Sequence, residues 1–505
     1  MSSEFKKKVE YAGYLLGNEF GASENHPMGK GFGGASTHPQ FKHMDLPPDG
    51  YSFSQNPGEK DYNYCKFINF VIDHLFPGFQ NNSDIISTEP KTHLDILSRI
   101  ASESLCLGGS IDDFKEFLKG RNILEQSQLA YNTRLAFIPT VPYTLSLTPW
   151  VIEIEDSTTL FFPYIHNGNT VGIDAKRIKF YPAIRSLLES SMCKAIITHI
   201  ESTAKSLPIL FDSHIIASKV VYSPLGISVP GENHKPIRPQ EIDSPLTLLF
   251  TNSWNQFSTG FYLRGGHDVL EAFSKLSEQY PQLNLIIRSQ LPEDLTPEHF
   301  ELVKTHPRIR VIDQFLTDDE LHNLMLDVDI YLVPSARIHV VSALKALSYG
   351  IPVIASDGWG FSDYVSDGEN GYLLPGRYGV CSWIDWENGM LREDYSSIKQ
   401  PNGTNETIIQ GLIEKIAYLL KNRNKLHEMS TNARGSVKSK FNLEQWNQAL
   451  KQTFDKVFLD GDEQAQAELL QAQLKAERFE FQYRTVFSEI SGQVPVDNLF
   501  LGLNS

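Results

Sequence analysis

Residues 329–376 read DIYLVPSARIHVVSALKALSYGIPVIASDGWGFSDYVSDGENGYLLPG, and this stretch contains the pattern that decides the fold. Ile330–Val333 is a short apolar run of the length and branching typical of a buried parallel strand. Apolar residues then recur at helical spacing over 340–347, and a second apolar run, Ile351–Ala355, follows Gly350. Strand, loop, helix and strand within about 30 residues form a βαβ unit, whose crossover should be right-handed.

The loop between the first strand and the helix is the first candidate for a binding site. Ser335 is predicted to be the N-cap of the helix. Ligands of such sheets bind outside the carboxyl ends of the strands, beside helix N-termini. We therefore expect Ala336–Val341 to face a phosphate group with unpaired backbone amides.

The same stretch resembles the donor-site signature of group 1 glycosyltransferases, which are retaining enzymes with the GT-B fold. Two positions differ: the family has glutamates where this chain has Arg337 and Lys345, and the second glutamate holds the ribose in the family. The resemblance implies an α/β protein with two Rossmann-like, doubly wound domains that face a cleft. The matching positions are Pro334, Ser335, Ala346, Gly350, Pro352, Val353, Asp357, Gly360 and the turn Asp367–Gly371.

An earlier segment carries the second part of this resemblance. In the family, an arginine after a strand and a lysine before a helix grip the donor diphosphate. Here Ser253 takes the place of that arginine and Arg264 the place of the lysine. An arginine binds phosphate oxygens through two parallel hydrogen bonds, so Arg264 is the strongest single candidate. The full set of predicted donor-binding residues is Asn252, Ser253, Arg264, Gly265, Arg288, Arg337, His339, Val340, Val341, Ser342 and Lys345.

Candidate catalytic residues lie in the N-terminal half. Leu135–Thr140 and Trp150–Ile154 are predicted to be two short buried strands, and Glu155 and Asp156 follow the second. Carboxylates at the carboxyl end of a parallel strand lie where α/β folds keep their chemistry. Asp156 fits equally well as the N-cap of the next helix, so both interpretations stand. His199, after another predicted strand, is interpreted as a satisfied histidine rather than a catalytic one.

The predicted domains follow from these patterns. Residues 1–235 form a Rossmann-like, acceptor-side domain with an irregular, glycine-rich segment over 17–60, whose run at 29–36 lacks the phosphate-loop sequence. Residues 236–440 form the donor domain. Residues 441–505 form C-terminal helices, of which the first crosses back to the N-terminal domain in the family. The apolar stripe of a predicted helix over 462–484 indicates a surface for a protein partner.

Composition excludes several other classes of protein. The 505 residues carry a net charge of −16, which argues against nucleic acid as a partner. The four cysteines are scattered without C-x-x-C spacing, so neither a zinc site nor a disulfide framework is indicated. Since no run reaches 18 apolar residues, we expect no transmembrane segment and a cytoplasmic protein.

The resemblance implies transfer of a sugar from a nucleotide-diphosphate donor with retention of anomeric configuration, as in a hexosyltransferase. The acceptor is unidentified and falls among sugars, lipids, peptides and small molecules. No metal ion and no cofactor is expected besides the nucleotide sugar as co-substrate, because cations and a helix N-terminus suffice for the leaving diphosphate. Two alternatives stay open: a degenerate GT-B subunit with a scaffolding role, motivated by Arg337 and Lys345, and a sugar-nucleotide epimerase.

Overall fold

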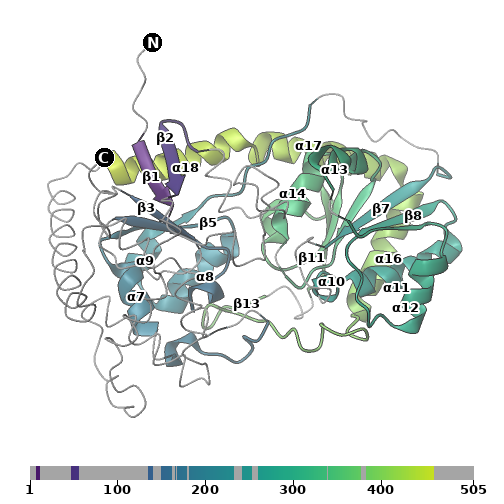
Figure 1. Cartoon of the computed structure of the whole chain (residues 1–505), viewed down its shortest axis with the longest axis horizontal. Coiled ribbons are helices and arrows are strands. Elements are labelled where there is room, and N and C mark those ends of the chain that lie inside the picture. Colours follow the sequence, from purple (N-terminus) through teal and green to yellow (C-terminus); the bar gives the residue numbers. More distant parts are fainter. Residues whose placement is uncertain are drawn as a thin grey trace, which may run out of the picture.

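The computed structural model describes residues 7–11, 47–55, 135–139, 149–161, 165, 168–178, 181–231, 242–252, 260–314, 316–337, 339–376 and 383–459. Within these ranges, two six-stranded parallel sheets with helices packed on them form an N-terminal and a C-terminal domain (Figure 1). The predicted α/β architecture is thus confirmed. Ser253, the glycine-rich run at 29–36, and the helices predicted over 64–118 and 462–484 lie outside the described residues.

The N-terminal sheet has the strand order β2-β1-β3-β4-β5-β6. Its third and fourth strands confirm the two short buried strands that the sequence predicts. Its first two strands were not predicted, because KKVEY and YSFSQ lack a sustained apolar run. The strands are β1 Lys7–Tyr11, β2 Tyr51–Gln55, β3 Ala136–Pro139, β4 Trp150–Glu153, β5 Cys193–Thr198 and β6 Val220–Tyr222.

The C-terminal sheet has the order β12-β11-β10-β7-β8-β9. The chain builds outward from β7 in one direction and from β10 in the other, so the strand order reverses between these two strands. In open α/β sheets, ligands bind at the carboxyl ends of the strands at such a point. The strands are β7 Leu246–Thr251, β8 Leu283–Arg288, β9 Ile309–Ile312, β10 Ile330–Val333, β11 Val353–Ser356 and β12 Gly371–Leu374.

The helices follow the predicted alternation with the strands. Thr317 and Glu320 form the predicted capping box, in which each side chain accepts from the other's backbone amide. The helices of the N-terminal domain are the 3₁₀ turns η3 Thr158–Phe161 and η4 Ala175–Arg177, then α7 Tyr181–Glu189, α8 Glu201–Phe211 and α9 His214–Lys219. Those that follow are α10 Gly260–Leu263, α11 Gly266–Gln279, α12 Pro297–Thr305, α13 Asp318–Leu326, α14 Val340–Ser348, α15 Phe361–Tyr364, α16 Glu406–Lys421, α17 Arg423–Lys440 and α18 Leu443–Leu459.

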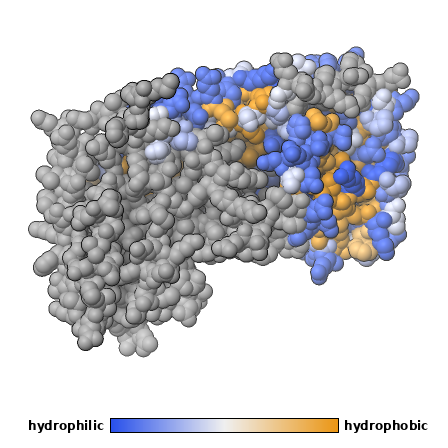
Figure 2. Space-filling view, turned by 45° about the horizontal axis from the view of Figure 1, so that its top comes forward, coloured by the Kyte–Doolittle hydropathy of each residue, from blue (hydrophilic) through white to orange (hydrophobic). Residues whose placement is uncertain are grey.

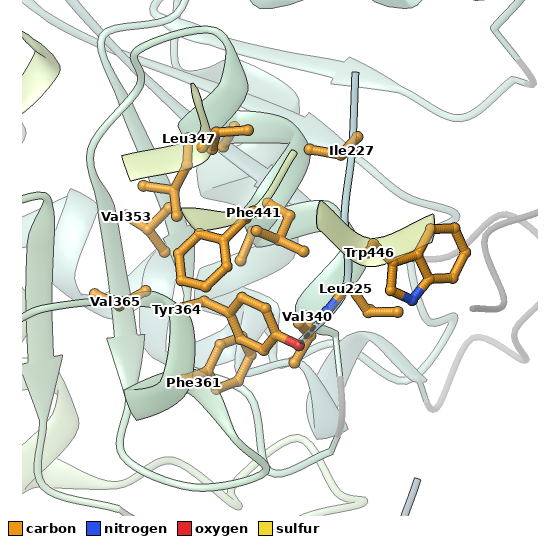
Figure 3. Packing of buried hydrophobic residues seen from close by; sticks show 14 of the residues in the cluster. Leu225, Ile227, Val340, Leu347, Val353, Phe361, Tyr364, Val365, Phe441 and Trp446 are labelled. Atoms are coloured by element: carbon orange, nitrogen blue, oxygen red, sulfur yellow. Dashed lines mark hydrogen bonds between the residues drawn. The ribbon is translucent and has the colours of Figure 1, made fainter. Parts of the chain in front are cut away.

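A shared apolar core and a buried tyrosine join the two domains. Tyr364 and Phe441 of the C-terminal half pack in one cluster with Leu225 from the end of the N-terminal domain (Figure 3). The Tyr364 hydroxyl donates to the His199 carbonyl at 2.7 Å and accepts from the Leu225 amide at 3.1 Å. These buried hydrogen bonds fix the carboxyl end of β5 against α15.

The chain crosses between the domains at two further places. Helix α18 runs along the N-terminal sheet (Figure 1), where Tyr51 donates to Asp455 Oδ1 at 2.7 Å. Residues 383–395, the returning segment, carry the hairpin β13 Ile384–Asp385 and β14 Met390–Leu391. Thr170 of the N-terminal domain donates through its hydroxyl to the Leu391 carbonyl at 2.7 Å. The returning segment therefore closes one side of the space between the domains.

The described surface mixes hydrophilic and hydrophobic residues on the face shown in Figure 2. Its large exposed apolar side chains come from separate elements, such as Phe300 of α12 and Tyr418 of α16. Among the described helices, none combines the length and the apolar character that crossing a membrane requires.

Candidate functional site

The β10–α14 loop, residues 334–339, differs from its predicted form at the helix start. Helix α14 begins at Val340, its N-cap is His339, and no side chain caps it. The prediction that Ser335 caps this helix is wrong, because the loop runs four residues further before the first helical turn. Ser335 Oγ instead accepts from the Arg337 amide at 3.0 Å, which folds the loop on itself.

The amides of this loop divide into two groups. The Ala336 amide donates to the Leu263 carbonyl at 2.7 Å, so the expectation of unpaired amides is wrong for Ala336 and Arg337. The first-turn amides of α14, at Val340, Val341 and Ser342, receive no side-chain cap. Uncapped amides and the helix dipole together favour an anion at this end of the helix.

Arg264 packs directly against the β10–α14 loop. Its Nη1 atom donates to the Arg337 carbonyl at 2.9 Å, and the residue is only 2% exposed. Arg264 is therefore not a solvated surface arginine. Gly265 follows at φ +80°, where a Cβ atom would lie 2.5 Å from the Pro334 carbonyl oxygen. Burial, reinforced by the charge of Arg337, lowers the pKa of Arg264 to about 9.

Three residues that follow or end strands of the C-terminal sheet each carry a buried polar atom without a hydrogen-bond partner among the described residues. Within the described residues these atoms are Oδ1 of Asn252, Nε of Arg288 and Nδ1 of His339. Asn252 and Arg288 are neighbours, because the Asn252 amide donates to the Arg288 carbonyl at 2.9 Å. Buried polar atoms are almost always hydrogen-bonded, since leaving one unpaired costs about 1–3 kcal/mol. Such atoms at a strand-order reversal indicate a site that a ligand completes.

The charge of this site is positive. Burial lowers the pKa of Arg288, and burial together with Arg264 and Arg288 holds the pKa of His339 well below its ordinary value. Neither Arg288 nor Arg337 forms an ion pair with any of the described carboxylates. Guanidinium groups that are buried with too little negative charge nearby favour the binding of an anion.

The N-terminal domain contributes carboxylates, among them Asp156, that interact electrostatically with this positively charged site. Asp156 Oδ1 accepts from the Thr158 and Thr159 amides at 2.8 and 3.0 Å, so it caps η3, as one of its two interpretations predicts. Burial, reinforced by the charge of Glu155, raises the pKa of Asp156 to about 7, and the Thr159 and Thr158 amides and Arg337 oppose the rise. The charge of Arg337, in the β10–α14 loop of the C-terminal domain, therefore reaches Asp156 in the N-terminal domain.

A second buried carboxyl, Glu393, was not predicted. It is fully buried, and it accepts from the Gly168 amide at 2.8 Å and from the Tyr395 hydroxyl at 2.6 Å. Burial, together with the charge of Asp156, raises the pKa of Glu393 to about 8. In the sequence, Leu-Arg-Glu-Asp reads as a solvated charged run. Only the return of this segment to Gly168 buries the carboxyl, and no local pattern signals that contact.

A pocket of about 370 Å³ opens beside the returning segment. Its walls come from one turn of the N-terminal domain and from the β13–β14 hairpin. Trp386, which follows the lining residue Asp385 in the chain, is 45% exposed. The lining residues are Thr170, Val171, Gly172, Ile173, Asp385, Asn388, Met390, Leu391 and Arg392.

The structure brings most of the predicted donor-site residues together. Lys345 lies apart from them in the last turn of α14, with Nζ 6.0 Å from the centre of the Tyr349 ring. Within the described residues, no group of three histidine, cysteine, aspartate or glutamate side chains could hold a metal ion. The residues around the carboxyl ends of β7, β8 and β10 are Asn252, Arg264, Gly265, Arg288, Arg337, His339, Val340, Val341 and Ser342.

Comparisons with known proteins extend this description. A family model described as Glycosyl transferases group 1 matches residues 257–382, which include Arg264 and the whole β10–α14 loop. No curated protein sequence matches the chain. A glycosyltransferase from Rickettsia africae ESF-5 is 12% identical, with a TM-score of 0.50, over 90% of this chain and 100% of its own. At this identity the likeness is one of fold, and the fold is GT-B.

Two further structures resemble parts of the chain. The C-terminal domain of a group 1 family glycosyl transferase from Francisella tularensis is 18% identical over 43% of this chain and 100% of its own, with a TM-score of 0.31. The HepE protein of Anabaena, solved in complex with UDP, is 14% identical over 68% of this chain and 89% of its own, with a TM-score of 0.45.

Proposed function

We propose that this chain, whose residues 257–382 match the group 1 glycosyltransferase model and whose fold is GT-B, is a glycosyltransferase that moves a hexosyl group from a nucleotide-diphosphate sugar to an acceptor hydroxyl with retention of anomeric configuration. One observation carries the proposal. Buried polar atoms of Asn252, Arg288 and His339 have no hydrogen-bond partner among the described residues; the first two residues lie at the carboxyl ends of β7 and β8, and His339 is the N-cap of the uncapped helix α14. A nucleoside diphosphate supplies the oxygens and the negative charge that this arrangement lacks.

The proposed chemistry follows from the charges. When the bond between the sugar and the diphosphate breaks, negative charge develops on the leaving phosphate oxygens. The Arg264 guanidinium is held against the β10–α14 loop, and the first-turn amides of α14 have no side-chain cap. With Arg288, these groups would stabilise the charge with little reorganisation. With a pKa of about 9, Arg264 stays cationic at neutral pH. We propose that these groups, together with Arg337, supply the positive charge, so that transfer is independent of a metal ion.

The acceptor would approach from the side of the N-terminal domain, where Glu155 and Asp156 are the proposed catalytic carboxylates. The pocket beside the returning segment suits a ligand rich in hydroxyl groups, because Asp385, Asn388 and Arg392 can hydrogen-bond it and apolar walls can pack on its carbon atoms. The acceptor class itself remains open among sugars, lipids, peptides and small molecules.

The proposed activity is tested by incubating the purified protein with UDP-, GDP-, ADP- and dTDP-sugars and measuring release of the nucleoside diphosphate. Water serves as the first acceptor, because transferases slowly hydrolyse their donors. Release from at least one donor is expected, and NMR of the freed or transferred sugar reads its anomeric configuration. A scaffolding subunit would release nothing from any donor. An epimerase would return an isomerised nucleotide sugar without release.

A further inference from the structure

His199 lies between two glutamates at the carboxyl ends of neighbouring strands. It follows β5, and Glu153 and Glu155 end and follow β4, which pairs with β5 in parallel. The ring atom Nδ1 is 3.8 Å from Glu153 Oε1, and Nε2 is 3.8 Å from Glu155 Oε1. The His199 side chain is 1% exposed, and neither ring nitrogen has a hydrogen-bond partner within the described residues.

This arrangement differs from that of an ordinary buried histidine. His299 in α12 is similarly buried, but its Nε2 lies 3.1 Å from Glu271 Oε1, within hydrogen-bond distance. Two unpaired nitrogens on one buried ring are costly, so a purely structural side chain would be expected to relax onto a partner. The prediction from sequence that His199 is a satisfied histidine is therefore wrong.

The backbone holds the ring and the cleft-side carboxylate in place. The His199 carbonyl accepts from Tyr364, and the Glu155 carbonyl accepts from the Thr203 hydroxyl at 2.8 Å. The backbone of His199 and of Glu155 is therefore held in place, while the ring nitrogens of His199 remain too far from the carboxylates for hydrogen bonds. In unliganded enzymes, catalytic hydrogen bonds are commonly long and shorten when the substrate binds.

Of the two glutamates, Glu155 is the one that faces the proposed donor site. The Glu155 side chain is 18% exposed, whereas that of Glu153 is 2% exposed. The Glu155 charge also acts on Arg264, where it counters the lowering of the arginine pKa by burial. Glu155 thus reaches toward the site between the domains, while Glu153 stays behind the ring.

We propose that His199 is a positioning residue for Glu155, with Glu153 holding the ring from behind. This inference rests on the proposed glycosyl transfer. In the step, the bond between the anomeric carbon and the donor phosphate oxygen breaks, and its electron pair leaves with the nucleoside diphosphate. The acceptor oxygen forms the new bond to the anomeric carbon, and its proton passes to the Glu155 carboxylate. His199 fixes the direction in which that carboxylate points.

Donor hydrolysis tests this role, because water must lose a proton as the acceptor hydroxyl does. For whichever nucleotide sugar the wild type hydrolyses, kcat and KM are compared in His199→Leu, His199→Gln and Glu153→Gln, together with the Kd for the matching nucleoside diphosphate. We expect His199→Leu to lower kcat about tenfold or more while donor KM and nucleotide Kd change less than twofold. His199→Gln should recover part of kcat, because its amide can still donate to Glu155.

His299→Leu is the matched control, since it removes another buried histidine from α12, on the far side of the C-terminal domain (Figure 1). It should lower the melting temperature and leave kcat unchanged. If His199→Leu does not fold, Glu153→Gln, which keeps the side-chain shape, carries the test and should lower kcat at least threefold.

The inference is overturned if folded His199 and Glu153 variants keep wild-type kcat, or if kcat falls only with the folded fraction. A wild type that releases no nucleotide from any donor would instead refute the proposed function itself. The two failures are therefore distinguishable.

Discussion

The Nη1 atom of Arg264 lies 2.9 Å from the carbonyl oxygen of Arg337, and this hydrogen bond ties the start of α11 to the loop before α14. A buried guanidinium thereby both shapes the loop and adds positive charge beside it. Arg264→Ala should lower kcat/KM for the donor on the order of 10²-fold, about the effect of removing one preoriented electrostatic donor. Arg264→Lys should recover part of the loss, because it restores the charge without the planar fork.

Because Arg264 is buried, its removal should also lower the melting temperature. Arg308→Ala is the matched control: Arg308 donates to the Tyr280 and Ser277 carbonyls, both at 2.8 Å, near the amino end of β9 and thus at the opposite edge of the sheet. It should lose stability while keeping kcat/KM. If Arg264→Ala keeps more than about half of the wild-type kcat/KM while folded, the donor site is placed wrongly.

Lys345→Ala should leave the donor KM within about twofold of wild type, well below the tenfold effect that corresponds to 1.4 kcal/mol. We expect this small effect because the Lys345 side chain extends over the Tyr349 ring in the last turn of α14, away from the uncapped end of the helix. A larger rise in KM, measured by donor hydrolysis, would show that Lys345 contacts the nucleotide, as the ribose-binding glutamate does in the family.

Asp156→Asn separates the two interpretations of Asp156. The asparagine Oδ1 can still accept from the Thr158 and Thr159 amides, so the cap and the melting temperature should be kept. If the carboxylate takes part in transfer, kcat should fall about tenfold or more. Asp156→Ala should in addition cost on the order of 1 kcal/mol of stability through the lost cap. Unchanged kcat in the folded asparagine variant would leave capping as the role of Asp156.

The buried carboxyl of Glu393 should make stability depend on pH. Burial raises its pKa from 4.5 to about 8, so the folded state prefers the protonated form. Its contribution to stability is therefore complete below about pH 4.5 and is lost as the pH rises through about 8. In Glu393→Gln, the side-chain oxygen can accept from Gly168 and the amide can donate to Tyr395. The fall in melting temperature between pH 5 and pH 8 should shrink by about 2 °C or more.

Glu387→Gln, an exposed change in the same returning segment, is the control and should follow the wild-type pH curve. If Glu393→Gln has the same pH dependence as wild type, Glu393 is already ionised across this range in the folded protein. The carboxyl would then not be a site of pH-dependent stability.

Patterns within single elements were predictable, and contacts between distant elements were not. Leu246–Thr251 and Ile330–Val333 were predicted as strands because buried parallel strands are continuously apolar. Strand β1 was not predicted, because KKVEY carries charges on both sides of its valine. The alignment of Arg264 with the loop before α14 followed from the family pattern. His199 and Glu393 were misread or missed, because their partners lie on other strands or more than 200 residues away.

The proposed diphosphate site is tested most directly by isothermal titration calorimetry of the wild type. UDP, GDP, ADP, dTDP and CDP are each titrated and compared with the corresponding monophosphate. If the diphosphate binds against Arg264, Arg288 and the N-terminus of α14, one of the diphosphates should bind about tenfold more tightly than its monophosphate or better. Arg288→Ala should remove most of that difference. Failure of every diphosphate to bind, or equal affinity for the diphosphate and its monophosphate, would contradict the account.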